Sequence, residues 1–101
     1  MDRKVKRAII KICPEAKKAF KEGKDVYSFL ASKIFDRPYI DCCPYELTNA
    51  EGCKYCENYS FAAQLRRTIA KLYVLFTLYP SVKLINEIDE CYNELNDCIE
   101  G

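Results

Sequence analysis

Apolar residues recur at helical spacing in five segments of the chain. The clearest apolar stripe advances by four, three, four and three residues, which keeps it on one side of a helix. Its members are Leu65, Ile69, Leu72, Phe76 and Tyr79. The stretch 66–79 opens with two arginines and then becomes almost entirely apolar, so its second half must be buried. The pattern predicts a central helix that begins near Asn58 or Ser60 and stops before Pro80.

A second stripe with the same alternating steps predicts the last helix, with Ser81 as its N-cap. Its members are Ile85, Ile88, Tyr92, Leu95 and Ile99. Two stripes of matching period and a short connection are typical of an antiparallel helical hairpin. Cys91 and Cys98 flank the second stripe about 10.5 Å apart along the axis, which is beyond disulfide reach. We therefore expect both to be thiols that either pack in the core or face a partner, with the core as the favoured interpretation.

Three shorter helical patterns precede the central helix. Asp2 is placed to cap the first of them. Pro14 suits the first turn of a second helix, and Gly23 stands where a helix ends in the left-handed conformation. Asp25 is placed to cap a third helix, which Pro38 stops.

Residues 37–58 interrupt this periodicity with two prolines, one glycine and four cysteines. A connection of this length is uncommon inside a compact domain unless it is held in place or has a function. The overall prediction is an all-α fold. It consists of a single domain, 1–101, built as a compact bundle of about five helices. The segment 37–58 forms a cysteine-rich loop or small metal-binding insert between the third and fourth helices.

Composition agrees with a compact helical domain, because half of the 101 residues are hydrophobic and only three are glycine. Sixteen basic and fifteen acidic residues leave a net charge of +1, so nucleic acid or an anionic membrane would need a local basic patch. The first helix supplies one, formed by Arg3, Lys4, Lys6, Arg7 and Lys11. A solvated charged face is the plain interpretation of this patch, and phosphate contact is the functional one. The acidic outer face of the last helix is read as solvated surface.

The compartment decides how the seven cysteines are interpreted. The apolar run near the start is interrupted by Lys11 and is too short for a signal-peptide core. No run reaches the roughly 20 apolar residues of a membrane span. We expect a cytoplasmic protein with no membrane partner and with reduced thiols.

The cysteines of the loop are candidate zinc ligands. Cys53 and Cys56 form a C-x-x-C pair, and Cys42 and Cys43 could complete an all-thiolate structural site. Against zinc, neighbouring residues such as Cys42 and Cys43 rarely both reach one tetrahedral ion. A redox C-x-x-C would need a strand-containing unit that the pattern does not predict. The remaining alternative is that these are reduced cysteines packed as small hydrophobic side chains.

Catalytic motifs are missing from the pattern. The chain has no histidine, which removes the commonest general base. No glycine-rich phosphate loop, Ser-His-Asp set or pair of catalytic carboxylates can be assembled from the sequence. We therefore expect a protein that is not an enzyme.

Two segments, KKAFKEGKDVYSFLASKIFDRPYIDC at 17–42 and RRTIAKLYVLFTLY at 66–79, resemble a known family. They are similar to the palm-to-fingers segment of phage-type family A DNA polymerases, over about sixty residues including the interval. The resemblance implies that the first run is a helical pair. It implies that the second is the fingers helix, which closes on the incoming nucleotide.

The resemblance also implies roles for individual residues. Arg67 and Lys71 match positions that contact the nucleotide triphosphate. Leu75 matches the position beside the base, and Tyr79 matches the tyrosine near the template. This chain departs from the family at Phe76 and at Pro80, each of which replaces a glycine. It also lacks the stretches that supply the two metal-binding aspartates, so it is not a polymerase by itself.

Two classes of function follow as hypotheses. In the first, a non-enzymatic helical protein of phage or mobile-element origin binds nucleic acid or nucleotide phosphates. Arg66, Arg67, Lys71 and Tyr79 are its candidate contacts, with help from the basic first helix. In the second, the protein inhibits a host enzyme or defence complex by binding it, in the manner of an anti-CRISPR or anti-restriction protein. Helix caps and stops within the chain favour a whole domain over a piece of a larger one.

Overall fold

The computed structural model describes residues 2–43 and 56–100, with side chains described for 2–43 and 61–98. All regular structure in these ranges is helical, with five α-helices, one 3-10 turn and no strand. The elements are α1 (Arg3–Ile12), α2 (Ala16–Glu22), α3 (Val26–Phe35), η1 (Tyr39–Cys42), α5 (Cys56–Leu78) and α6 (Val82–Glu100). The radius of gyration is 13.8 Å, which is close to that of a compact domain of about 100 residues. The predicted all-α fold is confirmed.

Three of the helix caps predicted from the sequence are present. The Asp2 carboxylate accepts a hydrogen bond from the Lys4 N–H at 2.9 Å, which begins α1. Asp25 accepts from the Ser28 N–H at 3.3 Å at the start of α3. The Ser81 hydroxyl accepts from the Leu84 N–H at 3.2 Å at the start of α6. Each bond satisfies a backbone donor that a helix start leaves unpaired.

The helix ends follow the predicted breakers with one difference. Gly23 closes α2 with a left-handed φ of 71°, as expected for a glycine in this position. Asp36 closes α3 with a φ of 51°, two residues ahead of Pro38. The start of α5 was predicted at Asn58 or Ser60, whereas the helix begins at Cys56. Residues 56–60 contain neither proline nor glycine, so nothing in them prevents the helix from extending upstream.

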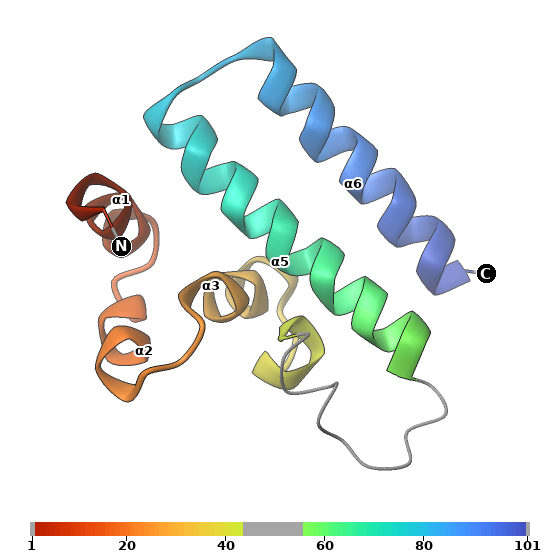
Figure 1. Ribbon diagram of the computed structural model, residues 1–101, viewed down its shortest axis with the longest axis horizontal. Helices are drawn as coiled ribbons and strands as arrows, with labels where there is room; N and C mark the ends of the chain where they lie inside the picture. Colours follow the sequence, from red (N-terminus) through yellow and green to blue (C-terminus); the bar gives the residue numbers. More distant parts are fainter. Residues whose placement is uncertain (1, 44–55, 101) are drawn as a thin grey trace.

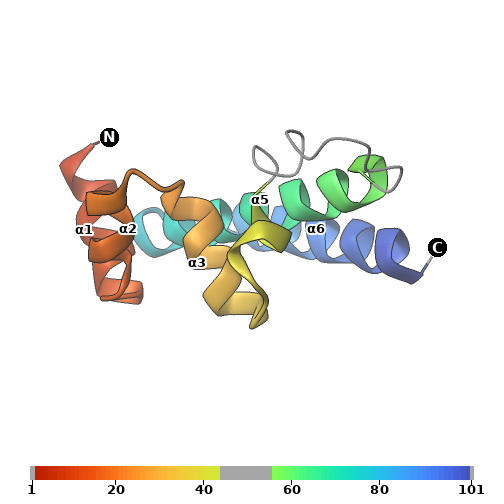
Figure 2. The ribbon, with the colours of Figure 1, turned by 90° about the horizontal axis from the view of Figure 1, so that it is seen from below.

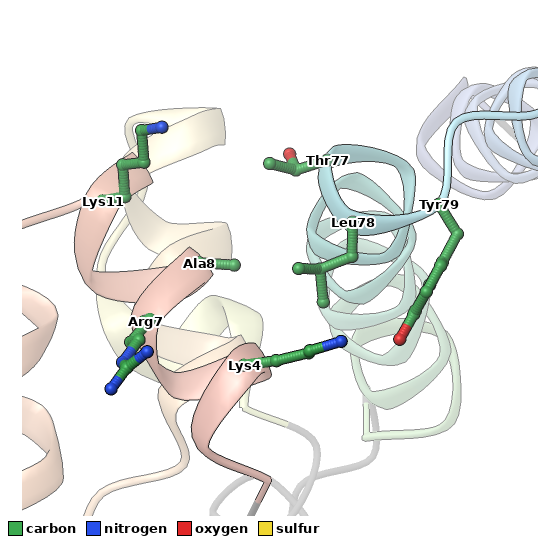
Figure 3. A pocket seen from close by; sticks show the side chains of 7 residues that line it. All are labelled: Lys4, Arg7, Ala8, Lys11, Thr77, Leu78 and Tyr79. Carbon is green, nitrogen blue, oxygen red and sulfur yellow. The ribbon is translucent and has the colours of Figure 1, made fainter.

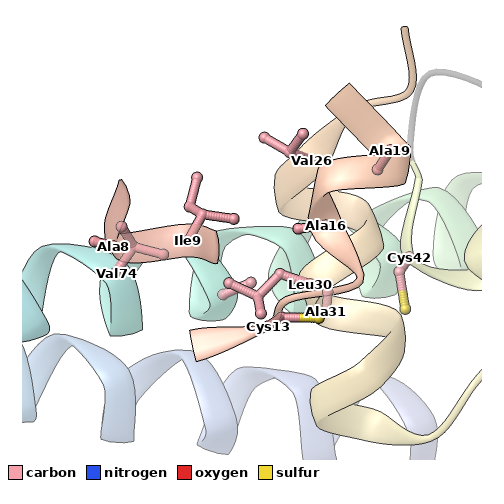
Figure 4. Close-up of a cluster of buried hydrophobic side chains, with 11 residues drawn as sticks. Ala8, Ile9, Cys13, Ala16, Ala19, Val26, Leu30, Ala31, Cys42 and Val74 are labelled. Carbon is pink, nitrogen blue, oxygen red and sulfur yellow. The ribbon is translucent and has the colours of Figure 1, made fainter. Parts of the chain in front are cut away.

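α5 is the central element, because it is buried on two opposite sides. Ala70 and Val74 on one side join a core cluster with α1, α2, α3 and η1, which Figure 4 shows around Ile9 and Leu30. Ala62, Leu65 and Ile69 on the other side join Leu95 of α6 in a second cluster. The second half of the stretch 66–79 was predicted to be buried, and this is confirmed only in part. Val74 is buried, Leu75, Phe76 and Leu78 are half-buried, and Tyr79 is exposed.

α5 and α6 form the predicted antiparallel hairpin, side by side in both ribbon views (Figure 1, Figure 2). α1, α2 and α3 lie on the other side of α5. The packing of the hairpin does not extend to its closed end, where Tyr79, Val82 and Ile85 are exposed. No described helix combines the length and apolarity needed to cross a bilayer.

Candidate functional site

Arg67, one of the predicted phosphate contacts, is engaged inside the protein. Its Nε donates to Asp25 Oδ2 at 2.6 Å, and a second guanidinium nitrogen donates to Asp25 Oδ1 at 3.3 Å. The guanidinium carbon lies 5.3 Å from the centre of the Tyr27 ring. This bidentate ion pair connects the start of α3 to the middle of α5. Arg67 therefore stabilises the fold whether or not a ligand is bound.

Burial and hydrogen bonding oppose each other at Asp25. Burial raises the pKa of this carboxyl, but hydrogen bonds from Arg67 and Ser28 and the charge of Arg67 outweigh it. The pKa of Asp25 therefore lies below its ordinary value of 3.8. The same carboxylate caps α3, and the Asp25 N–H donates to the Tyr39 hydroxyl at 3.0 Å.

Arg66, another of the predicted phosphate contacts, lies away from the surface. Its exposed fraction is 4%, and its Nη1 donates to the backbone carbonyl of Asp41 at 2.6 Å. Its Nε has no hydrogen-bond partner among the described residues. Burial, and then the nearby charge of Arg37, lower the pKa of this guanidinium. Arg66 ties η1 to α5 and does not reach the surface that Lys71 occupies.

The other positions matched by the resemblance, Lys71, Leu75 and Tyr79, follow Arg67 at steps of four on one face of α5 and differ in exposure. Lys71 is exposed, with its ammonium 6.0 Å from the centre of the Tyr27 ring. Leu75 is half-buried, whereas 60% of Tyr79 is exposed at the end of α5. Of the predicted contacts, Lys71 and Tyr79 are thus the ones that a ligand could reach without disturbing the fold.

A cavity of about 390 Å³ lies where α1 meets the end of α5. The residues that line it are Lys4, Arg7, Ala8, Lys11, Thr77, Leu78 and Tyr79 (Figure 3). Ala8 and Leu78 face each other across it, and Lys4 extends from α1 towards Tyr79. The guanidinium of Arg7 points away from α5. The site is therefore an apolar floor with an aromatic ring at one side and cations along one rim.

The basic residues of the rim belong to one face of α1. Lys4, Arg7 and Lys11 are spaced by three and four residues, and all three are exposed. None of them takes part in an ion pair within the described part of the chain. Cations beside a helix C-terminus also complement its dipole, which is the plain structural account of their place next to α5. An interaction with the helix dipole does not use the N–H donors of Lys4, Arg7 and Lys11, so these donors can still bind an anion.

The predicted zinc ligands fall partly outside the described residues. Cys42 and Cys43 are buried, and burial raises the pKa of Cys42 to about 11. Cys53 lies outside the described residues, as does the side chain of Cys56, whose backbone opens α5. Within the described side chains, no three Cys, Asp or Glu residues gather as metal ligands do. The zinc site stays a prediction that this structure does not test.

The thiols of the last helix lie beside the hairpin core, as expected. Cys91 and Cys98 are half-buried and pack against the cluster around Leu65 and Leu95. Burial raises the pKa of Cys91, and nearby glutamates act in the same direction. A thiol in such surroundings is a packing residue and a poor nucleophile at neutral pH.

The junction of α1 with α5 was missed by the sequence reasoning as a site. The basic row of α1 was recognised, but Tyr79 was assigned to a different face, with Arg67 and Lys71. The spacing of Lys4, Arg7 and Lys11 on one helix face was a signal for the row. Nothing in the sequence states that this row meets a residue about seventy positions downstream.

Comparisons with protein-family models, with curated proteins and with solved structures find no match for this chain. The resemblance to the fingers segment of family A polymerases therefore stays a hypothesis. The function has to be argued from the site alone.

Proposed function

We propose that this protein is a small nucleic-acid-binding protein that contacts phosphates with α1 and a base or sugar with Tyr79. The observation that carries the proposal is the basic row Lys4, Arg7 and Lys11. This row forms no ion pair within the described ranges and borders one cavity together with the exposed Tyr79. Proteins that bind single strands combine a cationic track for the backbone with aromatic rings on which bases stack. The apolar floor at Ala8 and Leu78 supports a ligand that is not purely ionic.

Charge supports the same proposal. α1 carries five basic residues and no acidic one, although the whole chain has a net charge of only +1. Lys71 is exposed on α5 two turns before Tyr79. It extends the cationic surface along α5, towards the position of Arg67. Arg66 and Arg67 contribute through the fold, because one is buried and the other is paired with Asp25.

Fluorescence anisotropy with labelled single-stranded DNA, duplex DNA and RNA tests the proposal at low salt. Three phosphate contacts give a slope of log affinity against log salt of roughly −2 to −3. The combined variant Lys4→Gln, Arg7→Gln and Lys11→Gln is expected to lose most of the binding. The matched control carries Lys17→Gln, Lys18→Gln and Lys21→Gln on α2 and removes the same amount of charge. It is expected to bind nucleic acid more tightly than the α1 variant does. Absence of salt-sensitive binding to all three nucleic acids would overturn the proposal.

Tyr79 distinguishes stacking from simple charge attraction. Tyr79→Ala is expected to weaken binding by about 1 to 3 kcal/mol, the usual contribution of one stacked base. Tyr79→Phe keeps the ring and is expected to bind as the native protein does. Equal affinities for all three proteins would show that the ring takes no part and that α1 acts by charge alone.

A second candidate function is the binding and inhibition of a host protein. The observation that favours it is the closed end of the hairpin, where the exposed fractions are 60% for Tyr79, 73% for Val82 and 45% for Ile85. Exposed aromatic and aliphatic side chains are common anchors of protein interfaces. Affinity capture from host lysate would be compared between the native chain and Val82→Glu with Ile85→Glu. If no protein is retained by the native chain and lost by the variant, this candidate is excluded.

A further inference from the structure

Charge is strongly segregated along this chain. Residues 2–24 contain nine basic and three acidic residues, whereas α6 contains one lysine and six acidic residues. The remainder of the chain is balanced, which is why the net charge is only +1. α1 and α2 lie on one side of α5, and α6 lies on the opposite side (Figure 1). The molecule therefore carries its basic helices and its acidic helix on different sides of α5.

Neither surface neutralises the other within one molecule. Glu90, Glu94 and Asp97 form an exposed row on α6, with steps of four and three residues. No ion pair in the described ranges joins α6 to α1, and none involves this acidic row. The basic row of α1 likewise forms no ion pair among the described residues, so the described part of each molecule has two surfaces of opposite sign that are not paired with each other.

The two rows match in register. Lys4, Arg7 and Lys11 are spaced by three and four residues, which corresponds to about 4.5 and 6 Å along a helix axis. The acidic row, followed in the reverse direction, has the same two steps. An antiparallel contact between the helices would form the pairs Lys4 with Asp97, Arg7 with Glu94 and Lys11 with Glu90. Opposite charges in register favour one orientation of docking and disfavour others.

We propose that α6 of one copy of this chain docks antiparallel on α1 of a second copy, so that the protein associates head to tail. The contact joins two different surfaces, so each added molecule leaves one basic and one acidic surface open. Exposed ion pairs are individually weak and are screened by salt. The association is therefore reversible, concentration-dependent and strongest at low ionic strength.

This inference does not depend on the proposed function, but it shares a surface with it. Nucleic acid bound to the basic row would occupy the place that α6 takes in the assembly. Added oligonucleotide is thus expected to shift the protein from assembly to nucleic-acid complex. Self-association measured without nucleic acid tests this inference even if the protein binds none.

Sedimentation equilibrium of the native protein over a wide concentration range, at about 20 mM and about 500 mM salt, is the first measurement. We expect the association constant to fall at least tenfold, by order of magnitude, at the higher salt, where the Debye length is only a few ångströms. A native protein that stays monomeric at low salt up to millimolar concentration would overturn the proposal.

Charge reversal identifies the surfaces. One variant carries Lys4→Glu, Arg7→Glu and Lys11→Glu, and the other carries Glu90→Lys, Glu94→Lys and Asp97→Lys. Each alone is expected to be monomeric, and their equimolar mixture is expected to associate because the pairs are restored with opposite sign. The control Lys17→Glu, Lys18→Glu and Lys21→Glu on α2 makes the same change of net charge outside the α1 row, and it is expected to associate more tightly than the variant of the α1 row.

Circular dichroism establishes that each variant is folded before its association is measured by sedimentation equilibrium. If a charge-reversed variant is unfolded, the milder variant with Glu90→Gln, Glu94→Gln and Asp97→Asn replaces it. This variant is expected to associate roughly tenfold more weakly than the native protein. Association of either row variant at the native level, or a mixture of reversed variants that remains monomeric, would overturn the proposal.

Discussion

Arg67 and Asp25, 42 residues apart in the chain, form a bidentate ion pair with a shortest distance of 2.6 Å between Nε and Oδ2. The side chains are 23% and 20% exposed, so water screens the pair only in part. Because Asp25 also caps α3, the pair joins the start of one helix to the middle of another. It is the main polar link between α3 and α5 in the described chain.

Replacing Arg67 by methionine is expected to destabilise the fold by about 2 kcal/mol. The value lies between that of an exposed pair and that of a fully buried one, because Asp25 would be left half-buried without its counter-ion. Urea unfolding followed by circular dichroism measures the change. Arg67→Lys keeps the positive charge but loses the bidentate geometry of the guanidinium. Its stability should lie between that of the native protein and that of Arg67→Met. A variant as stable as the native protein would contradict this role for the pair.

The pH dependence of stability is expected to report on Asp25. Its pKa is lower in the folded protein than its ordinary value of 3.8, so its contribution is present above about pH 4. That contribution is lost as pH falls through the folded-state pKa. Urea midpoints between pH 6 and pH 2 should fall more steeply for the native protein than for Asp25→Asn. Parallel curves for the two proteins would argue against a depressed pKa.

Arg66→Met is expected to change stability by less than about 1 kcal/mol, unlike the same change at position 67. Arg66 is buried with one neutral acceptor, and its Nε has no partner in the described ranges. Arg66 forms no ion pair within the described ranges, so removing its buried charge relieves desolvation and offsets the lost hydrogen bond. Thermal and urea unfolding of both methionine variants side by side provide the measurement. A loss at Arg66 as large as that at Arg67 would show this comparison to be wrong.

Gly23→Ala is expected to cost about 1 kcal/mol, entirely from backbone strain. The φ of 71° is unfavourable for alanine, whereas no atom lies within 4 Å of the position that its Cβ would occupy. Asparagine tolerates this conformation better, so Gly23→Asn should be less destabilising. Denaturant unfolding of the two variants checks the order. Alanine equal to asparagine would show that another factor dominates at this turn.

Tyr92 is expected to ionise last among the tyrosines for which a shift is resolved. Burial, together with its hydrogen bond to Tyr73, raises the pKa of Tyr92 to about 12. Its contribution to stability is complete below about pH 10 and is lost as pH rises through 12. Ultraviolet titration of tyrosinate should lose its most alkaline step in Tyr92→Phe. If the native protein and Tyr92→Phe give the same titration curve above pH 11, the tyrosine with the raised pKa is not Tyr92.

The helices and their caps could be predicted because their causes are local. Asp2, Asp25 and Ser81 act on backbone within three residues of themselves, and Gly23 acts on its own φ. The hairpin followed from two stripes of equal period. The start of α5 was misplaced because Asn58 and Ser60 were taken as possible N-caps, and a residue of this type does not prevent a helix from beginning upstream of it.

The candidate site was predicted less well, because its causes are tertiary. Arg66 and Arg67 are neighbours in sequence but point about 100° apart on the helix. One therefore meets η1 and the other meets Asp25. Which arginine is buried depends on where α3 and η1 pack against α5, and periodicity alone does not contain that information. The same holds for the meeting of Lys4 with Tyr79.

The position of α6 at the edge of the bundle has a consequence for local unfolding. Of its described side chains, those of Ile88 and Leu95 are buried. Leu95 packs in one cluster with Ala62, Leu65 and Ile69 of α5, and Tyr92 lies against Phe35. The cluster around Ile9 and Leu30 contains no residue of α6. α6 can therefore open while that cluster remains intact, as a cooperative unit with its own smaller free energy. In native-state hydrogen exchange its amides should exchange ahead of those in α3.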